Sequence, residues 1–235
     1  MSKLAVLVAI FAPVVGGAVI YIAASIFSPT LLFFPYQRSV GGTRVYSEEP
    51  ISDAITPVIS VSNAKLEKSE IFEPGALRRP IFLTNGGLRW DILSIGAPHS
   101  FGLTRPAGEN VVINRSNAAL DKVWNGSGSS ITGVRSLTAV VTHERTHVLI
   151  RAHFGAFVDR IYPAWAREGY CDYIAGSSTL SDTQATELRA SGSTLPALFY
   201  YDSRKKVERI LQENGGSVDK LFNSSGSATG ASGNE

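Results

Sequence analysis

A pair of histidines four residues apart, His143 and His147, constrains this 235-residue chain more than any other feature. Apolar residues recur at helical spacing around the pair, and Ser136 and Gly155 are suited to cap the two ends of a helix. Residues four apart lie on one face of a helix, so both imidazoles can reach one metal ion. Glu144 lies about 100° further round. From there its carboxylate can accept a proton from a metal-activated water molecule without binding the metal itself.

A second helix is predicted between Pro163 and Gly176, because proline favours the first turn of a helix and glycine the residue after its end. Glu168 and Asp172 lie four residues apart and share a face of it. A catalytic zinc site has three protein ligands and an open position, and Glu168 can be the third ligand. A carboxylate one turn later suits the orientation of a ligand histidine. Glycine in mid-helix destabilises the helix by about 1 kcal/mol relative to alanine. A close approach of two helices would explain why Gly169 is present, so such an approach is predicted there.

The segment HERTH at 143–147, followed by WAREGYCDY at 165–173, resembles the gluzincin superfamily of zinc metallopeptidases. That superfamily has thermolysin-like, aminopeptidase-like and compact peptidase MA-like members. The resemblance covers roughly residues 80–222. It implies a zincin-like domain with Zn²⁺ as cofactor and a peptide or protein as substrate. The residues implied for the site are the zinc ligands His143, His147 and Glu168, the general base Glu144, and Asp172, which orients a ligand histidine.

The chain departs from the family pattern at Ala166, where many relatives have a bulky aliphatic residue, and at Cys171, where they have a small one. Cys171 lies one turn from Glu168, and a thiolate is a good zinc ligand. A ligand set of two histidines and Cys171 is therefore an alternative to the set with Glu168. An inert, buried cysteine is the other interpretation.

The resemblance also predicts that a later segment donates a hydrogen bond to the oxyanion formed at the substrate carbonyl. Tyr200 is the candidate, because it lies on the core-facing stripe of a helix predicted over 195–213 and the pattern Tyr-x-x-Ser-x-x-x-Val resembles the corresponding helix of peptidase MA-like domains. Tyr201 and His153 are the other candidates, although His153 lies on a different helix face from His147. A tyrosine that only packs is the alternative for Tyr200.

No charged residue occurs from Leu4 to Phe27. A helix of that length is about 36 Å long, enough to cross a hydrocarbon core of about 30 Å. Residues 1–36 are therefore predicted to be an N-terminal transmembrane helix that anchors the chain in a membrane. A cleaved signal peptide and a buried core helix are the alternatives. The predicted location is a single-pass membrane protein with its catalytic domain on the extracytoplasmic side.

The rest of the chain predicts an α+β fold, in which a small mixed sheet carries the active-site helix and the glutamate helix that follows it. Residues 37–79 are expected to be a polar lead-in with β-like runs such as 57–61, residues 80–222 the zincin-like domain, and residues 223–235 a disordered Ser/Gly-rich tail. Strands are predicted at 80–84, 92–95 and 109–114. In zincin-like domains the strand before the active-site helix binds extended peptide at its edge, and 109–114 is the candidate.

Charge and cysteine content exclude several classes of protein. The chain has 22 Lys and Arg against 20 Asp and Glu, a net charge of +2, which is too balanced for a nucleic-acid binder. A single cysteine excludes an intramolecular disulfide and any multi-cysteine metal site.

The predicted function is therefore a membrane-anchored zinc metallopeptidase that hydrolyses peptide bonds. A non-proteolytic, membrane-tethered zinc-binding or interaction module is the alternative, against which Glu144 argues, because a structural zinc site does not require a general base. A hydrolase of non-peptide amides or esters uses the same chemistry and is not separated by the sequence.

Overall fold

The structure is a computed structural model that describes residues 3–105, 108–129 and 132–227, with side chains from Pro13 to Ser225. The fold is α+β, as predicted. In chain order, its helices and strands are α1 (Lys3–Phe27), β1 (Tyr36–Val40), β2 (Thr43–Ser47), α2 (Ile55–Leu66), β3 (Ile81–Leu83), α3 (Leu88–Leu93), β4 (Gly102–Thr104), β5 (Val111–Ile113), β6 (Ser116–Asn117), β7 (Lys122–Trp124), β8 (Val134–Ser136), α4 (Leu137–Phe154), α5 (Val158–Ile161), α6 (Ala164–Ala175), α7 (Asp182–Ala190), α8 (Pro196–Asn214) and α9 (Val218–Ser227).

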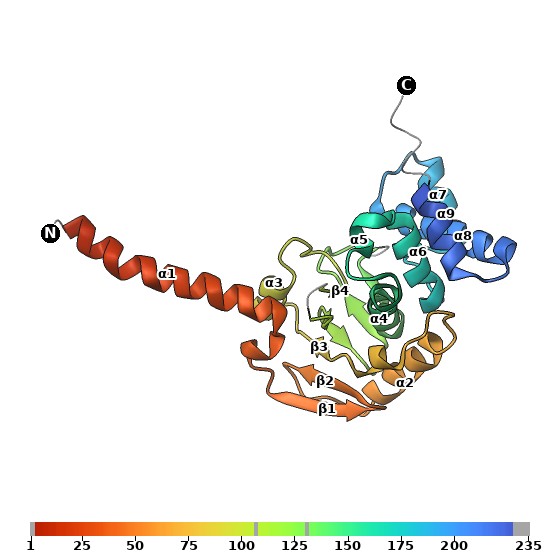
Figure 1. Cartoon of the computed structure of the whole chain (residues 1–235). Helices are drawn as coiled ribbons and strands as arrows, with labels where there is room; N and C mark the ends of the chain where they lie inside the picture. The colour runs from red at the N-terminus through yellow and green to blue at the C-terminus, as the bar shows by residue number, and fades with distance from the viewer. Residues whose placement is uncertain (1–2, 106–107, 130–131, 228–235) are drawn as a thin grey trace, which may run out of the picture.

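Five strands form a mixed sheet in the order β1-β2-β3-β5-β4 (Figure 1). Strands β2, β3 and β5 are parallel, and β1 and β4 are antiparallel to their neighbours. Successive side chains of a strand point to opposite faces, so Ile81 and Ile113 pack against α2 and α4 while Phe82 and Val112 pack against α3. Because both faces are covered, β3 and β5 are apolar along their whole length.

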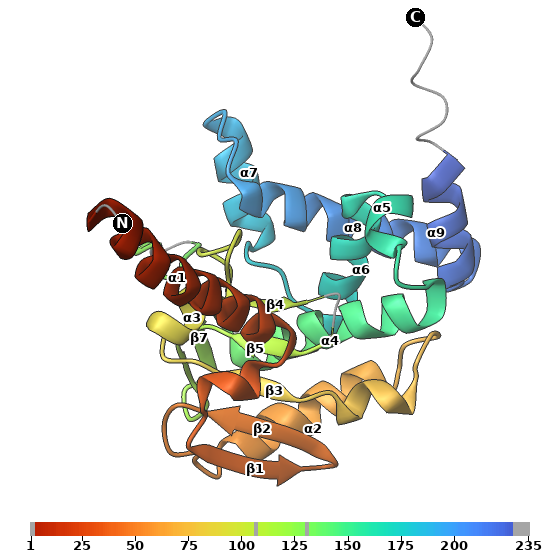
Figure 2. The same cartoon turned by 60° about the vertical axis from the view of Figure 1, so that its left-hand side comes forward.

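The helices α4, α6 and α8 are stacked beside the sheet, with α4 next to the strands and α6 between α4 and α8 (Figure 2). Their shared core includes Leu149 of α4, Tyr170 of α6, Val207 of α8 and Phe222 of α9. The sheet therefore positions α4, and α4 in turn positions α6. This arrangement brings the two motif-bearing segments of the sequence side by side.

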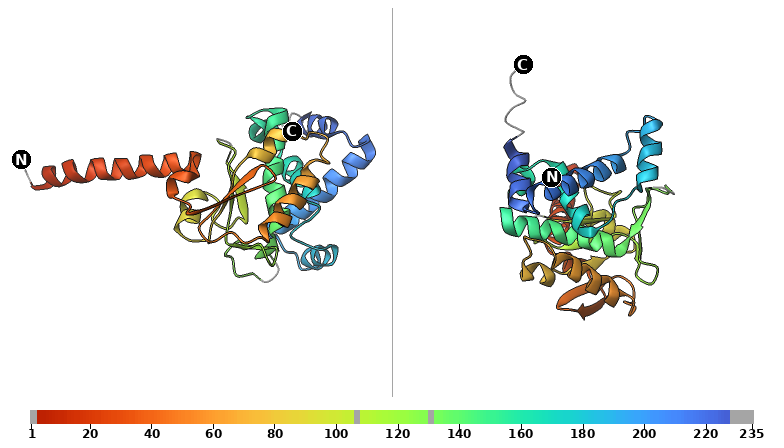
Figure 3. Two further views of the ribbon diagram at one scale, coloured as in Figure 1. Left: turned by 90° about the horizontal axis from the view of Figure 1, so that it is seen from below. Right: turned by 90° about the vertical axis from the view of Figure 1, so that its right-hand side faces the viewer.

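The predicted transmembrane anchor is wrong. The N-terminal segment does form a helix, α1, which projects away from the rest of the chain (Figure 3). Pro13 lies inside it. Among the described residues, no helix is both long and apolar enough to cross a membrane. This finding also overturns the predicted single-pass membrane location with an extracytoplasmic catalytic domain.

The alternative of a buried core helix does not fit α1 either. Val14, Val19 and Ile20 are 65%, 61% and 70% exposed. On the described part of α1, these apolar side chains have no core to pack into.

Other segments also differ from the sequence-based expectations. The run 57–61 belongs to helix α2, because Ile55, Val58, Ile59 and Leu66 are buried at helical spacing. The predicted strand 92–95 begins inside α3. Residues 37–79 contribute β1 and β2 to the same sheet as β3 and β5. Helix α9 extends to Ser227, into the predicted tail, and residues 228–235 lie outside the described part of the chain.

The mid-helix glycine, Gly169, does mark a close approach of two helices, although the partner is α8. A Cβ atom at Gly169 would lie 2.5 Å from the backbone oxygen of Ser203 and 2.8 Å from Cγ2 of Val207. Real Cβ atoms do not approach backbone oxygens so closely, so any larger residue must push α6 and α8 apart.

We expect Gly169→Ala to lower the free energy of unfolding by roughly 1 to 3 kcal/mol, as overpacking typically does, although alanine favours the helix by about 1 kcal/mol. Chemical denaturation measures the change. Gly75→Ala is the matched control, because a Cβ atom there meets nothing within 4 Å. Equal stability of the two variants would show that the contact with Ser203 imposes no constraint.

Candidate metal centre and active site

Helix α4 carries the histidine pair and begins at a firmly capped N-terminus. The Ser136 hydroxyl accepts a hydrogen bond from the backbone N–H of Ala139 at 3.1 Å, and the carboxylate of Asp121 accepts one from the N–H of Thr138 at 2.7 Å. Gly155 ends the helix, as predicted. Because the first turn is held in this way, the positions of His143 and His147 along the helix are well defined.

Glu168 on α6 lies opposite the histidine pair. Its Oε2 atom is 3.2 Å from Nε2 of His143 and 3.5 Å from Nε2 of His147. In a tetrahedral site with metal–ligand distances of 2.0 to 2.1 Å, neighbouring ligand atoms are about 3.3 Å apart. Each of these two distances is close to the spacing of neighbouring zinc ligands, and the donor set of two imidazoles and one carboxylate suits that metal.

Asp172, one turn after Glu168, binds the other side of His143. Nδ1 of His143 donates a hydrogen bond to Oδ1 of Asp172 at 2.7 Å, and Nη2 of Arg135 donates to the same oxygen at 2.9 Å. The Asp172 side chain is fully buried and that of Arg135 is 8% exposed. A carboxylate in this position fixes the ring orientation of His143 and leaves Nε2 directed at Glu168.

Asp172→Asn is expected to weaken Zn²⁺ binding about 10- to 100-fold, because an amide cannot hold the His143 tautomer as a carboxylate does. Competition with a chromophoric chelator measures this affinity. Asp202→Asn on α8 is the control, since that side chain is 55% exposed and pairs with Arg189. Unchanged affinity in Asp172→Asn would contradict the orienting role.

The electrostatics of the cluster favour a cation. Burial alone would lower the pKa of His143, but Asp172, Glu168 and Glu144 raise it to about 10. Burial would raise the pKa of Glu168, yet the neighbouring His147 and His143 hold it well below its usual range. Burial alone would raise the pKa of Asp172, but Arg135 and His143 together hold it below its usual value. Without a metal ion, positive charge is thus retained as a proton on His143, which a metal ion would replace.

Glu144 lies beside the ligand cluster and is itself held in place. The hydroxyl of Thr104 on β4 lies 2.9 Å from Oε2 of Glu144 and 2.7 Å from its backbone oxygen, and it can donate its proton to either. Gly102, also on β4, allows this approach, because a Cβ atom there would lie 3.1 Å from Cγ of Glu144. The edge strand therefore sets the orientation of the Glu144 carboxylate.

A cavity of about 320 Å³ opens beside His143 and Glu144. Leu195 before α8 and Pro196 and Ala197 in its first turn form one wall, and Tyr200 of α8 also lines the cavity. The Tyr200 ring centroid is 6.5 Å from that of His143. Burial, with added repulsion from the nearby carboxylates, raises the pKa of Tyr200 to about 12.

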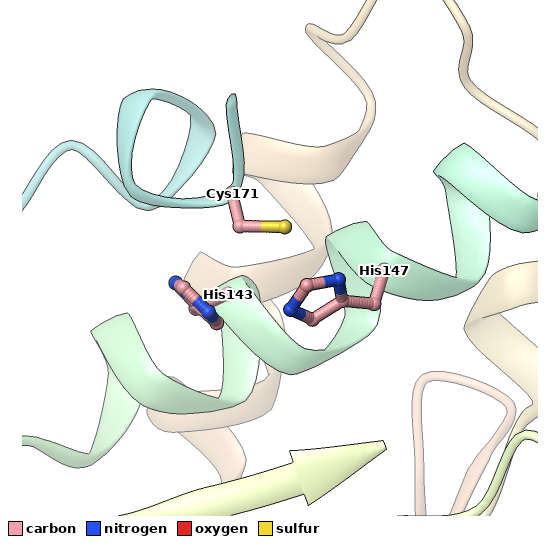
Figure 4. Close-up of side chains that lie close together, drawn as sticks. All are labelled: His143, His147 and Cys171. Carbon is pink, nitrogen blue, oxygen red and sulfur yellow. The ribbon is translucent and has the colours of Figure 1, made fainter. Parts of the chain in front are cut away.

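Cys171 also faces the histidine pair. One ligand atom each of His143, His147 and Cys171 lie within 4.8 Å of one another. Figure 4 shows the sulfur of Cys171 projecting from α6 toward the two imidazole rings of α4. Burial and the charges of Glu168, Glu144 and Asp172 raise the pKa of this thiol well above its usual value.

The other residues considered from the sequence lie elsewhere. The Tyr201 hydroxyl donates a hydrogen bond to Asp182 at 2.8 Å. His153 pairs with Asp219 at 2.8 Å on the exposed side of α4. His99, to which the sequence assigned no role, lines the cavity beside Glu144.

Sequence reasoning missed two residues, Thr104 and Arg135. Both lie on short strands outside the motifs, and nothing in their local sequence indicates that they bind Glu144 or Asp172. Segment 109–114 was also the wrong choice for a peptide-binding edge. Its strand, β5, lies between β3 and β4, so β4 is the edge strand next to α4.

Comparisons with known protein families, with characterised proteins and with solved structures found no match to this chain. What the site can do must therefore be inferred from its geometry and its chemistry.

Proposed function

We propose that this protein is a zinc-dependent metallopeptidase of the gluzincin type that hydrolyses peptide bonds. One observation carries the proposal: the Glu168 carboxylate oxygen lies 3.2 and 3.5 Å from the Nε2 atoms of His143 and His147, next to the glutamate that would act as general base. His143, His147 and Glu168 would hold the metal. When bound, zinc would lower the pKa of a water molecule to about 7 and polarise the substrate carbonyl.

Glu144 would take the proton from the attacking water molecule. The water oxygen forms a bond to the carbonyl carbon, the C–N bond breaks, and the same proton passes from Glu144 to the leaving amine. A hydrogen bond from Thr104 to Oε2 of Glu144 would leave Oε1 to accept that proton. Since Glu144 lines the cavity beside His143, its carboxylate can reach a substrate bound there.

The substrate backbone would bind along strand β4. This strand pairs with β5 on one side, and its other edge has no strand partner among the described residues, so an extended peptide can add to it. The Tyr200 hydroxyl, which lines the same cavity, would donate a hydrogen bond to the developing oxyanion. The cavity walls at Leu195 and Ala197 are suited to an apolar or small polar substrate side chain.

The test is metal analysis of the purified full chain together with digestion of a peptide library. We expect about one zinc ion per chain, and hydrolysis that a chelator abolishes and added zinc restores. His147→Ala should lose both the metal and the activity, whereas His153→Ala, on the same helix but paired with Asp219, should keep both. A chain that retains no zinc, or hydrolysis that survives the chelator, would overturn the proposal. Turnover of esters or simple amides without peptides would instead indicate a different hydrolase.

A further inference from the structure

A second residue of α6 is placed to bind the same ion as Glu168. Cys171 follows Glu168 by three positions, and side chains three apart on a helix point to the same side. Pairs of ligands with this spacing on one helix bind metals in other helical sites. The Cys171 sulfur belongs to a set of ligand atoms, with His143 and His147, that lie within 4.8 Å of one another.

Cys171 lies in the core shared by α4, α6 and α8 and is also close to the histidine pair. It is fully buried, it takes part in no disulfide, and no hydrogen bond to it is found within residues 13–105, 108–129 and 132–225. Figure 4 shows the sulfur on the side of α6 that faces the two histidines. With bond lengths of about 2.3 Å to sulfur and 2.0 to 2.1 Å to nitrogen, tetrahedral coordination places sulfur about 3.6 Å from each imidazole nitrogen. The present spacing, within 4.8 Å, exceeds this value by no more than about 1.2 Å.

We propose that Cys171 is a fourth protein ligand of the metal in the resting protein, completing a set with His143, His147 and Glu168. On coordination the S–H bond is replaced by a metal–sulfur bond and the proton leaves to solvent. This inference uses the metal site of the proposed function, but it does not require the protein to hydrolyse peptides.

Two consequences follow for the chemistry of the site. Four protein ligands fill a tetrahedral zinc site and leave no open position, so the resting form is latent and the sulfur must leave before substrate can react. A thiolate also shifts metal preference toward soft ions such as Zn²⁺ and Cd²⁺ and away from Mn²⁺. A site of two imidazoles and one carboxylate alone would prefer Zn²⁺ and Cd²⁺ over Mn²⁺ less strongly.

The experiment is cobalt substitution of the full chain, followed by absorption spectroscopy and metal titration. We expect wild-type protein to show an intense near-ultraviolet sulfur-to-cobalt charge-transfer band that Cys171→Ser lacks. The same substitution should weaken Zn²⁺ binding roughly 100-fold or more. Residues that only orient a metal ligand typically change the affinity by about 10- to 100-fold, so a loss at or above that limit indicates a ligand. It should also reduce the preference for Cd²⁺ over Mn²⁺. Ala175→Ser, at a fully buried position one turn along the same helix, should change neither the spectrum nor the affinity.

The outcomes separate this inference from the proposed function. Cobalt binding without the charge-transfer band, or zinc affinity equal in wild type and Cys171→Ser, overturns the sulfur ligand and leaves the metallopeptidase standing. If the charge-transfer band is present but the protein hydrolyses no peptide, the proposed peptidase function is wrong and the assignment of Cys171 as a ligand stands. If both proposals hold, Cys171→Ala should raise peptide hydrolysis per bound zinc ion severalfold. A protein that binds neither metal overturns both.

Discussion

Glu144→Gln is expected to lower kcat/KM for peptide hydrolysis by about 10²- to 10⁴-fold, the usual contribution of a general base. Glutamine keeps the size of the side chain and can still accept a hydrogen bond from Thr104, which lies 2.9 Å from Oε2. It cannot accept the proton of the attacking water molecule. Because Glu144 is not one of the three proposed zinc ligands, the zinc content should stay near one ion per chain.

Steady-state kinetics with a fluorogenic peptide and metal analysis of the same preparation measure the two quantities. Glu213→Gln, at an exposed position near the end of α8, is the matched control and should keep wild-type kinetics. The loss should appear mainly in kcat, because the proton transfer occurs after the substrate binds. If Glu144→Gln keeps the metal and hydrolyses peptides at the wild-type rate, Glu144 is not the base.

Arg145→Ala is expected to lower the free energy of unfolding by roughly 3 to 5 kcal/mol. Arg145 is one of the largest fully buried side chains. It donates hydrogen bonds to Oδ1 of Asn63 at 2.6 Å and to the hydroxyl of Thr43 at 3.0 Å. These contacts join α4 to α2 and β2. No carboxylate lies within ion-pair distance of Arg145 in the described part of the chain, and burial lowers its pKa to about 10. Truncation leaves a cavity and unpaired buried acceptors.

Urea denaturation followed by circular dichroism measures this change. Arg160→Ala, at an exposed position on α5, should alter stability by no more than about 0.5 kcal/mol. Arg145→Met should be less destabilising than Arg145→Ala, since it fills much of the volume and removes the buried charge. A loss below about 1 kcal/mol for Arg145→Ala would show that the buried contacts contribute little.

Local patterns in the sequence predicted the helices of the site well. The cap at Ser136 and the end at Gly155 are as expected for α4, and Pro163 and Gly176 flank α6. These signals work because caps act through bonds within a few residues. The run 57–61 misled, because β-branched residues favour strands locally while burial against the sheet decides the helix.

The sequence by itself determined that His143 and His147 share a face of one helix, and that Glu168 and Asp172 share a face of another, because both facts depend only on helical periodicity. Only the tertiary structure decided which atoms meet. It brings Glu168 to 3.2 Å from His143, sets Arg135 on Asp172 and Thr104 on Glu144, and turns Cys171 toward the same point. These contacts join residues up to 40 positions apart. They exist because the sheet holds α4 and α4 holds α6, and no pattern within one segment carries that information.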